Sequence, residues 1–287
     1  MRVEGHTWVV VGAQGMLGRD LVEILRDRGA TVVELDRGET DITDAASVDG
    51  AVPPCDVIVN CAAYTAVDRA EEEEPLALAI NGDGAGHVAR VASKRGARFV
   101  HISTDYVFAG NATEPYAELA ARAPLSAYGR TKAAGERAVE GSAADYLIVR
   151  TAWLYGEHGP CFPKTIARAG AERGSLTVVD DQLGQPTWTR DLSDFIIRLV
   201  VADAPSGIYH GTSSGQASWF EFARAIVVSK GLGEIVSPTD SSSFVRPAPR
   251  PAWSVLAHGS ARSVGVEPIG DWRERWEAAA ERVLASS

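Results

Sequence analysis

Two residues with acid–base side chains, Tyr128 and Lys132, lie four positions apart in the segment YGRTK. On a helix this spacing places both side chains on one face. An ammonium group beside a phenol favours the phenolate, so we expect Lys132 to lower the pKa of Tyr128 from its ordinary value of about 10. Such a tyrosine could give a proton to a carbonyl group that is being reduced. The pattern is common by chance, so its meaning depends on the segments around it.

A third polar side chain, Thr104, follows the apolar run RFVHIS. If that run is a parallel strand, Thr104 lies at its carboxyl end, where ligands bind in such sheets. Its hydroxyl could then hydrogen-bond the substrate carbonyl oxygen beside Tyr128. The alternative is a hydroxyl that only satisfies the backbone of a turn.

A cofactor site is indicated by Gly12, Gly15 and Gly18, which follow the β-branched run TWVVV and precede an amphipathic segment. Gly12 permits a tight turn, Gly15 lets backbone amides approach a pyrophosphate, and Gly18 permits close packing of a helix on a sheet. The spacing GxxGxxG differs from the more familiar GxGxxG, but the flanking strand and helix supply the context that this motif needs. A plain strand-to-helix turn is the alternative.

The residues after the second predicted strand bear on the choice of nicotinamide cofactor. Asp36 lies 18 residues after Gly18, where an acid accepts hydrogen bonds from the adenosine ribose and favours NAD. Arg37 follows it and could instead pair with the 2′-phosphate of NADP. Asp41 and Ile42 could lie against the adenine. Both cofactors stay open from these residues, and solvated loop charges are the alternative.

The elements that must position these residues follow from the apolar pattern. Apolar runs predict strands at 7–11, 31–35, 56–60, 98–103 and 146–150, and helical spacing predicts helices at 17–28, 75–95 and 126–139. Strands that alternate with helices indicate parallel strands joined by right-handed crossovers. We therefore predict an α/β fold built on a Rossmann-type doubly wound parallel sheet.

The second half of the chain predicts a smaller α+β substrate lobe. After about residue 152 proline, glycine and tryptophan become frequent, the tract 238–251 indicates a loop, and 272–285 indicates an amphipathic terminal helix. We place a dinucleotide-binding domain at 1–152, together with about 178–203, and the substrate lobe at 153–177 and 204–287.

Charge and cysteine content exclude several classes of protein. The chain has 38 acidic and 28 basic residues, a net charge of −10, which disfavours a nucleic-acid partner because such binding needs a basic face. No apolar run approaches the roughly 18 residues that a membrane-spanning helix needs. The three cysteines are widely spaced and form no CxxC motif, which disfavours both a disulfide framework and zinc. We expect a cytoplasmic protein without a membrane association.

Taken together, these segments resemble the extended short-chain dehydrogenase/reductases and, more narrowly, the dTDP-4-dehydrorhamnose reductase family. The resemblance covers nearly the whole chain, and several of its segments lie in the second lobe. The segments are GAQGMLG (12–18), NCAAYTAVDRAE (60–71), STDYVFAG (103–110), YGRTKAAGE (128–136), RTAWLYG (150–156), DDQLGQPTWTRDL (180–192), GIYHGTSSGQASWFEFA (207–223) and RPAPRPAWSVL (246–256).

The resemblance implies reduction of the C4 ketone of dTDP-4-dehydro-L-rhamnose to dTDP-L-rhamnose, with NADPH as cofactor and NADH left open. It also implies Thr104, Tyr128 and Lys132 as the catalytic residues. Tyr128 would protonate the alkoxide that forms when hydride reaches the sugar C4, and Thr104 would hold and polarise that oxygen. Lys132 would tune Tyr128 and could hold the nicotinamide ribose.

The family motifs map onto further contact residues. The implied cofactor contacts, besides Tyr128 and Lys132, are Gly12, Gln14, Gly15, Met16, Leu17, Gly18, Cys61, Ala62, Ala63 and Tyr64. The implied sugar contacts, besides Thr104 and Tyr128, are Val67, Asp105, Tyr106 and Trp153. In the proline-rich loop, Arg246 and Arg250 could bind the substrate diphosphate, because guanidinium groups suit phosphate oxygens.

Three departures from the family pattern, Ala109, Cys161 and Trp253, leave the exact sugar open. One alternative is a 4-ketoreductase of antibiotic deoxysugar synthesis, such as a dihydrostreptose-type synthase. Another is an epimerase or dehydratase of the same superfamily, although Tyr106 directly after Asp105 favours simple reduction. A third is a non-catalytic regulatory subunit, which the intact catalytic residues disfavour.

The acidic run at 71–74 could suggest a Mg²⁺ ion at a dimer contact. Such a run is more often a solvated start of a helix, so we expect no bound metal. A homodimer stays open from the sequence.

Overall fold

Six strands, all parallel to their neighbours, form the central sheet of a computed structural model that describes residues 2–285. The strand order is β10-β5-β4-β3-β1-β2. The strands are β1 (Thr7–Val11), β2 (Thr31–Leu35), β3 (Val57–Asn60), β4 (Arg98–Thr104), β5 (Tyr146–Thr151) and β10 (Gly207–His210). Because β2 and β3 lie on opposite sides of β1, the direction of winding changes there and opens a crevice at the carboxyl ends of the strands. The predicted α/β fold is confirmed.

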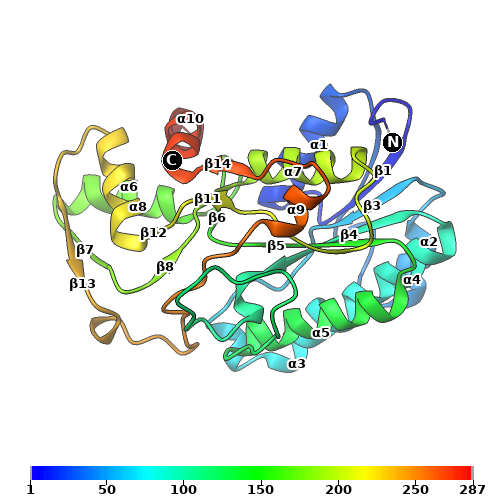
Figure 1. Cartoon of the computed structure of the whole chain (residues 1–287), viewed down its shortest axis with the longest axis horizontal. Coiled ribbons are helices and arrows are strands. Elements are labelled where there is room, and N and C mark those ends of the chain that lie inside the picture. Colours follow the sequence, from blue (N-terminus) through cyan, green and yellow to red (C-terminus); the bar gives the residue numbers. More distant parts are fainter. Residues whose placement is uncertain (1, 286–287) are drawn as a thin grey trace.

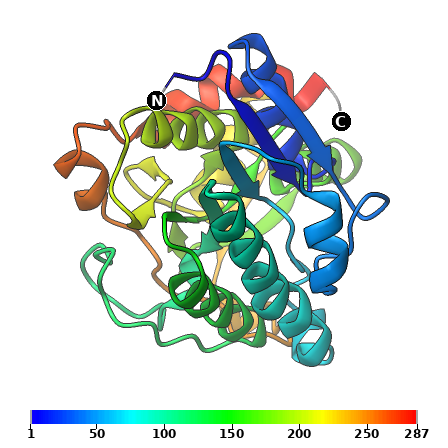
Figure 2. The same cartoon turned by 90° about the vertical axis from the view of Figure 1, so that its right-hand side faces the viewer.

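Helices cover both faces of the sheet, as Figures 1 and 2 show. Trp8 and Val10 point into one core with α1 (Met16–Asp27) and α7 (Thr189–Val201). Val9 and Val11 point into the other core, with α2 (Ala45–Ala51), α4 (Ala85–Arg95) and α5 (Ala127–Ser142). Strand β1 is therefore apolar after its first residue, since successive residues face one or the other of two buried layers.

Short helices join the strands at the carboxyl edge of the sheet. They are η1 (Arg69–Glu71), α3 (Glu74–Leu78), the π-helical η2 (Ala79–Gly84) and η3 (Asp105–Val107). Of these, α3 and η2 continue directly into α4 and form one helical segment at 74–95, in agreement with the predicted helix at 75–95.

A second group of elements lies beside the sheet, at the left of Figure 1, around an aromatic core that includes Tyr155, Phe222, Trp272 and Trp276. Its helices are α6 (Phe162–Arg173), α8 (Trp219–Ser229) and α10 (Trp272–Ala285). Its strands pair in twos: β6 (Leu154–Tyr155) with β9 (Thr187–Trp188), β8 (Leu183–Gly184) with β12 (Ala217–Ser218), β7 (Leu176–Val179) with β13 (Val236–Thr239), and β11 (Ser213–Ser214) with β14 (Ile269–Asp271).

The structure differs from the sequence analysis at two places. Strand β10 lies within the range 204–287 that we assigned to the substrate lobe, yet it pairs with β5 at the edge of the central sheet. The four-residue strand GIYH lacks the long apolar run that marked the other strands, so nothing in its pattern separates it from the short strands of the second lobe. The tract predicted as a loop at 238–251 includes the end of β13 and the short helix η4 (Ser241–Ser243).

The last short helix, α9 (Gly259–Ser263), packs together with Val266 and Ile269 on the same core as α1 and α7. The remainder of the proposed lobe division stays a prediction. All three cysteines have free thiols. Within residues 2–285, no helix combines the length and apolarity needed to cross a membrane.

Candidate active site

Thr104, Tyr128 and Lys132 come together where β4 ends beside α5. Thr104 is the last residue of β4, and the other two lie one turn apart near the start of α5. That start is set by Ser126, whose hydroxyl oxygen accepts a hydrogen bond from the Gly129 backbone N–H at 3.1 Å. Thr104 and Lys132 are buried and Tyr128 is partly buried, and the Thr104 hydroxyl lies within hydrogen-bond reach of the Tyr128 phenol.

The sequence predicts that Lys132 lowers the pKa of Tyr128, and this prediction is wrong because the structure raises that pKa. Burial raises the pKa of Tyr128 to about 12, and the hydrogen bond between Thr104 and the phenol opposes this only in part. The Lys132 ammonium donates to the carbonyl oxygen of Ile102 at 2.6 Å, so it is directed to the backbone of β4. Desolvation of the phenolate therefore dominates. A tyrosine that keeps its proton in this way is suited to act as a proton donor.

The pKa of Lys132 is shifted in the direction that burial of a cation predicts. Desolvation lowers its pKa to about 8, while the negative charge of Glu136 one turn later acts in the opposite direction. The charge state of Lys132 therefore changes close to neutral pH, within the range in which an enzyme would work.

Beneath these residues lies a buried ion pair that the sequence analysis did not single out. Glu136 is 0% exposed and Arg150 is 1% exposed, and the Arg150 guanidinium donates to both carboxylate oxygens at 2.8 and 2.7 Å. The Ser103 hydroxyl donates to Glu136 at 2.6 Å, and Arg122 also pairs with it. Burial alone would raise the pKa of Glu136, but the hydrogen bonds and charge of Arg150 outweigh it and lower this pKa. The sequence offered one signal for this ion pair, namely Arg150 at the end of the apolar run YLIVR, because a buried arginine needs an acidic partner.

Asp105 and Tyr106, two predicted sugar contacts, adjoin the catalytic residues. The Thr104 hydroxyl donates to Asp105 at 3.0 Å, and the Tyr106 ring lies edge-on to Tyr128 with centroids 5.5 Å apart. Burial raises the pKa of Asp105 to about 6. The carboxylate thus orients the hydroxyl that touches the Tyr128 phenol.

The glycine loop has the tight turn and close packing that its spacing predicts. Gly12 has a left-handed φ of +77°, and a Cβ atom there would lie 2.7 Å from the backbone nitrogen of Ala62. A Cβ atom on Gly18 would overlap the carbonyl oxygen of Gly12. Gly15 is the N-cap of α1, so the free N–H groups of that helix face the crevice. Helix N-termini of this kind bind phosphate groups.

The other predicted cofactor contacts fall into two groups. Asp36 accepts a hydrogen bond from the Gln14 backbone N–H at 2.9 Å, which places its carboxylate against the glycine loop beside exposed Arg37. The carboxylate of Asp41 is held within its own turn by Thr43, and Ile42 is packed in the core. The structure therefore brings Asp36 and Arg37 to the glycine loop. Asp41 and Ile42 make their contacts away from it.

The segment after β3 lies directly beside the glycine loop, because β3 pairs with β1. Cys61, Ala62, Ala63 and Tyr64 are partly buried there, and the Tyr64 backbone N–H donates to Asn81 at 2.8 Å. Burial raises the pKa of Cys61 to about 12, so this thiol stays protonated. The contact between Ala62 and Gly12 joins the two loops that the family resemblance assigns to the cofactor.

The two arginines predicted to bind diphosphate have different surroundings. Arg250 donates to Asp68 at 2.9 Å, so it links the proline-rich loop to the segment after β3, next to partly buried Val67. Arg246 is exposed to solvent. A role for Arg250 in phosphate binding would require exchange of its carboxylate partner.

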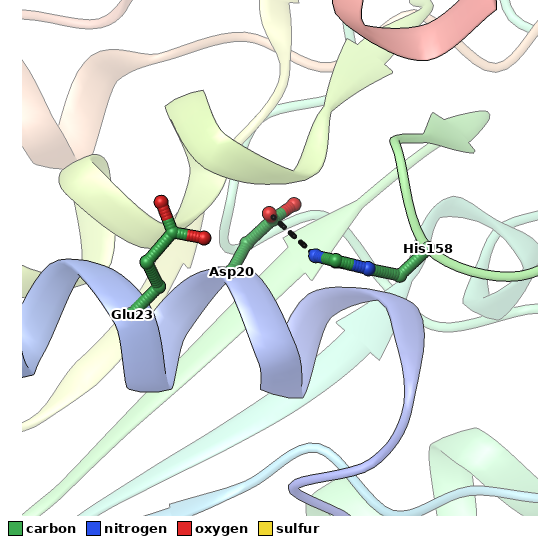
Figure 3. Close-up of side chains that lie close together, drawn as sticks. All are labelled: Asp20, Glu23 and His158. Carbon is green, nitrogen blue, oxygen red and sulfur yellow. Dashed lines mark ion pairs between the residues drawn. The ribbon is translucent and has the colours of Figure 1, made fainter. Parts of the chain in front are cut away.

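A separate group of possible metal ligands, Asp20, Glu23 and His158, is drawn in Figure 3. Their ligand atoms lie within 4.8 Å of one another, and Asp20 is completely buried. The Arg190 guanidinium lies 2.8 Å from Glu23 and 3.8 Å from Asp20, so a positive charge already compensates both carboxylates. We interpret the group as an ion-pair network that joins α1, α7 and the loop after β6.

Known proteins resemble this chain over most of its length. The family model described as RmlD substrate binding domain matches residues 6–285. A dTDP-4-dehydrorhamnose reductase from Streptomyces griseus is 47% identical over 275 residues, covering 93% of this chain and 90% of the relative. A dTDP-4-keto-6-deoxy-D-glucose reductase from Streptomyces niveus is 47% identical over 270 residues, covering 92% and 93%. The crystal structure of a dTDP-4-dehydrorhamnose reductase from Bacillus anthracis in complex with NADP is 39% identical, has a TM-score of 0.92 and covers 97% and 99%.

Proposed function

We propose, since the chain belongs to the RmlD substrate-binding-domain family of dTDP-4-dehydrorhamnose reductases, that it reduces the C4 ketone of dTDP-4-dehydro-L-rhamnose with NADPH to form dTDP-L-rhamnose. It is an oxidoreductase with a Rossmann-type sheet. One observation carries the proposal: a buried Thr104 hydroxyl contacts the Tyr128 phenol one turn from Lys132, at the same edge of the sheet as a glycine loop.

The residues present fit a dinucleotide. A side chain at Gly12 or Gly18 would fill the turn before α1, and the N–H groups at the start of α1 are free to hold a diphosphate. Arg37 is suited to bind the 2′-phosphate of NADPH. The crystal structure of the Bacillus anthracis relative contains the oxidised cofactor, NADP. When bound, NADPH supplies the hydride for the sugar carbon.

The chain's own residues then handle the proton. Tyr128, whose pKa burial raises, holds its proton until charge develops on the sugar oxygen, and then donates it. Thr104 would hold the same oxygen once its hydroxyl proton, which Asp105 accepts in this structure, turns to the substrate. The Lys132 ammonium, anchored on the Ile102 carbonyl, would hold the nicotinamide ribose.

A second candidate substrate is dTDP-4-keto-6-deoxy-D-glucose. A relative named for reduction of that sugar has the same 47% identity to this chain as the relative named for the rhamnose precursor. Three residues that depart from the family pattern lie in or near the second lobe: Ala109 lines a small cavity with Tyr106, Trp253 packs at a tilt against Tyr116, and Cys161 caps α6.

A coupled assay distinguishes the two substrates. dTDP-glucose is treated with a 4,6-dehydratase, with or without a 3,5-epimerase, and NADPH oxidation and the product NMR spectrum are recorded. We expect oxidation only with the epimerase present, whereas oxidation without it supports the second candidate. No oxidation in either mixture would refute the proposal and favour a non-catalytic nucleotide-binding subunit.

A variant of Tyr128 and a control variant of Tyr146 test the role of the Tyr128 phenol. Tyr128→Phe should lower kcat about 10²- to 10⁴-fold, because the general acid is removed while the ring is kept. Tyr146→Phe, on β5 away from the site, should keep kcat. Full activity of Tyr128→Phe would exclude the proposed mechanism.

The oligomeric state and location of the enzyme belong to this proposal as well. We propose action in the cytoplasm, where the three free thiols would stay reduced. We propose a homodimer, for which light scattering during gel filtration is the test.

A further inference from the structure

Trp153 lies just past the edge of the sheet that carries Thr104. It follows β5, whose last residue, Thr151, pairs in register with Thr104. Its φ is +47°, and Asp203 is the other non-glycine residue with a positive φ among residues 2–285. A left-handed backbone is rare for a bulky residue and persists only where the surroundings hold it. The conformation of Trp153 is therefore imposed by its neighbours.

The first of these neighbours is Trp219, from the second lobe. The two indoles stack with centroids 3.5 Å apart and planes inclined by 8°. Isolated aromatic rings prefer offset or edge-to-face arrangements, so packing enforces this face-to-face stack. Trp219 is itself anchored, because it begins α8 directly after the capping residue Ser218 and because Phe162 packs on it with centroids 4.5 Å apart.

The second neighbour is Gly184, which leaves room for the edge of the indole. A Cβ atom on Gly184 would lie 2.5 Å from Cε2 and 2.7 Å from Nε1 of Trp153. Strand β8 pairs with β12 so that Gly184 lies opposite Ala217, two residues before Trp219. The strand pair and Trp219 therefore form a slot with space for one indole and no additional side chain.

We propose that Trp219 and Gly184 are positioning residues that hold the Trp153 indole against an apolar face of the deoxysugar. This inference rests on the proposed function and on the sugar contact that the family resemblance implies for Trp153. A flat indole of defined orientation suits the apolar face of a 6-deoxyhexose, and its position is set by residues that need not touch the ligand. The second lobe would thereby contribute to selection of the sugar while leaving binding of the nucleotide to other groups.

Binding of dTDP-L-rhamnose and of dTDP to the full-length chain, measured by calorimetry, tests the proposal. Trp219→Ala removes one wall of the slot, and Gly184→Ala displaces the indole from the other side. Each should weaken dTDP-L-rhamnose binding and raise the KM of the keto-sugar roughly 5- to 10-fold, the scale of one aromatic pair. Affinities for dTDP and NADPH should stay within about twofold. Trp219→Phe should restore most of the sugar affinity, since it keeps an aromatic wall.

The control is Phe220→Ala, which removes the neighbouring aromatic ring in the first turn of α8 and should leave both affinities unchanged. Equal losses for dTDP and dTDP-L-rhamnose, or no loss in a folded Gly184→Ala protein, would overturn the inference. The two proposals fail separately: a wild-type chain that does not oxidise NADPH with the keto-sugar rejects the proposed function, whereas an active wild type with unaffected slot variants rejects the positioning role alone.

Discussion

Replacement of Glu136 by glutamine tests how much the ion pair beneath the active site stabilises the fold. The carboxylate has four donors: Oε1 accepts from Ser103 and from Nε of Arg150, and Oε2 accepts from Arg122 and from Nη2 of Arg150. Glutamine keeps the side-chain volume, so no cavity forms. Whichever way the amide is turned, its NH₂ group faces two of these donors.

The expected loss follows from those contacts. Two hydrogen bonds to charged groups, worth about 1.5–3 kcal/mol each, lose their acceptor. Their sum, about 3–6 kcal/mol, overlaps the cost of about 3–5 kcal/mol for removing one partner from a buried ion pair. We therefore expect Glu136→Gln to lower the free energy of unfolding by about 3–5 kcal/mol at neutral pH.

Urea denaturation followed by circular dichroism measures this loss. Glu140→Gln is the matched control, because Glu140 also pairs with Arg122 but is 32% exposed and should change stability by no more than about 1 kcal/mol. Replacement of both partners, by Glu136→Leu with Arg150→Met, should recover much of the loss, since no buried charge then remains unpaired.

The pH dependence gives an independent check of the sign. The folded protein lowers the pKa of Glu136 below its ordinary value of 4.5, so its stabilisation is complete above that pH and is lost as the pH falls through the lowered pKa. The difference between wild type and Glu136→Gln should therefore shrink in acid. A loss below about 1 kcal/mol at neutral pH, or a difference that does not change in acid, would refute the reasoning.

Three further outcomes are expected. The rate should fall as pH rises through about 8, where buried Lys132 loses its proton, and a pH–rate profile that stays flat there would contradict this role. Gly18→Ala should weaken NADPH binding and lower the melting temperature, because its Cβ would overlap the Gly12 carbonyl, whereas Gly38→Ala meets nothing within 4 Å and should preserve both. Arg37→Ala should raise the KM for NADPH about tenfold and leave that for NADH nearly unchanged, because only NADPH carries the 2′-phosphate; equal effects on both cofactors would remove Arg37 from the site.

The sequence predicted those parts of the fold whose signal is local. Strands β1 to β5 each contain a short apolar run, and such a run can be identified without knowledge of the strand that pairs with it. The turn at Gly12 was predictable for a similar reason, since the glycine spacing and the flanking elements lie within a few residues.

Features that depend on distant partners could not be predicted in this way. The edge strand β10 gains its place only by pairing with β5, and the stack of Trp219 on Trp153 joins residues far apart in the chain. The pKa of Tyr128 was predicted with the wrong sign, because the spacing places Lys132 on the same helical face but carries no information about burial or about the Ile102 carbonyl that receives the ammonium.

The position of β10 has a consequence for synthesis of the chain on the ribosome. The edge strand of the sheet is separated from its partner β5 by roughly 55 residues, most of which build the second lobe. At roughly 5–20 residues per second, β5 waits about 3–11 s for β10 to emerge. During that interval its unpaired edge is open to other nascent chains, so the growing polypeptide passes through a period in which it is prone to aggregation.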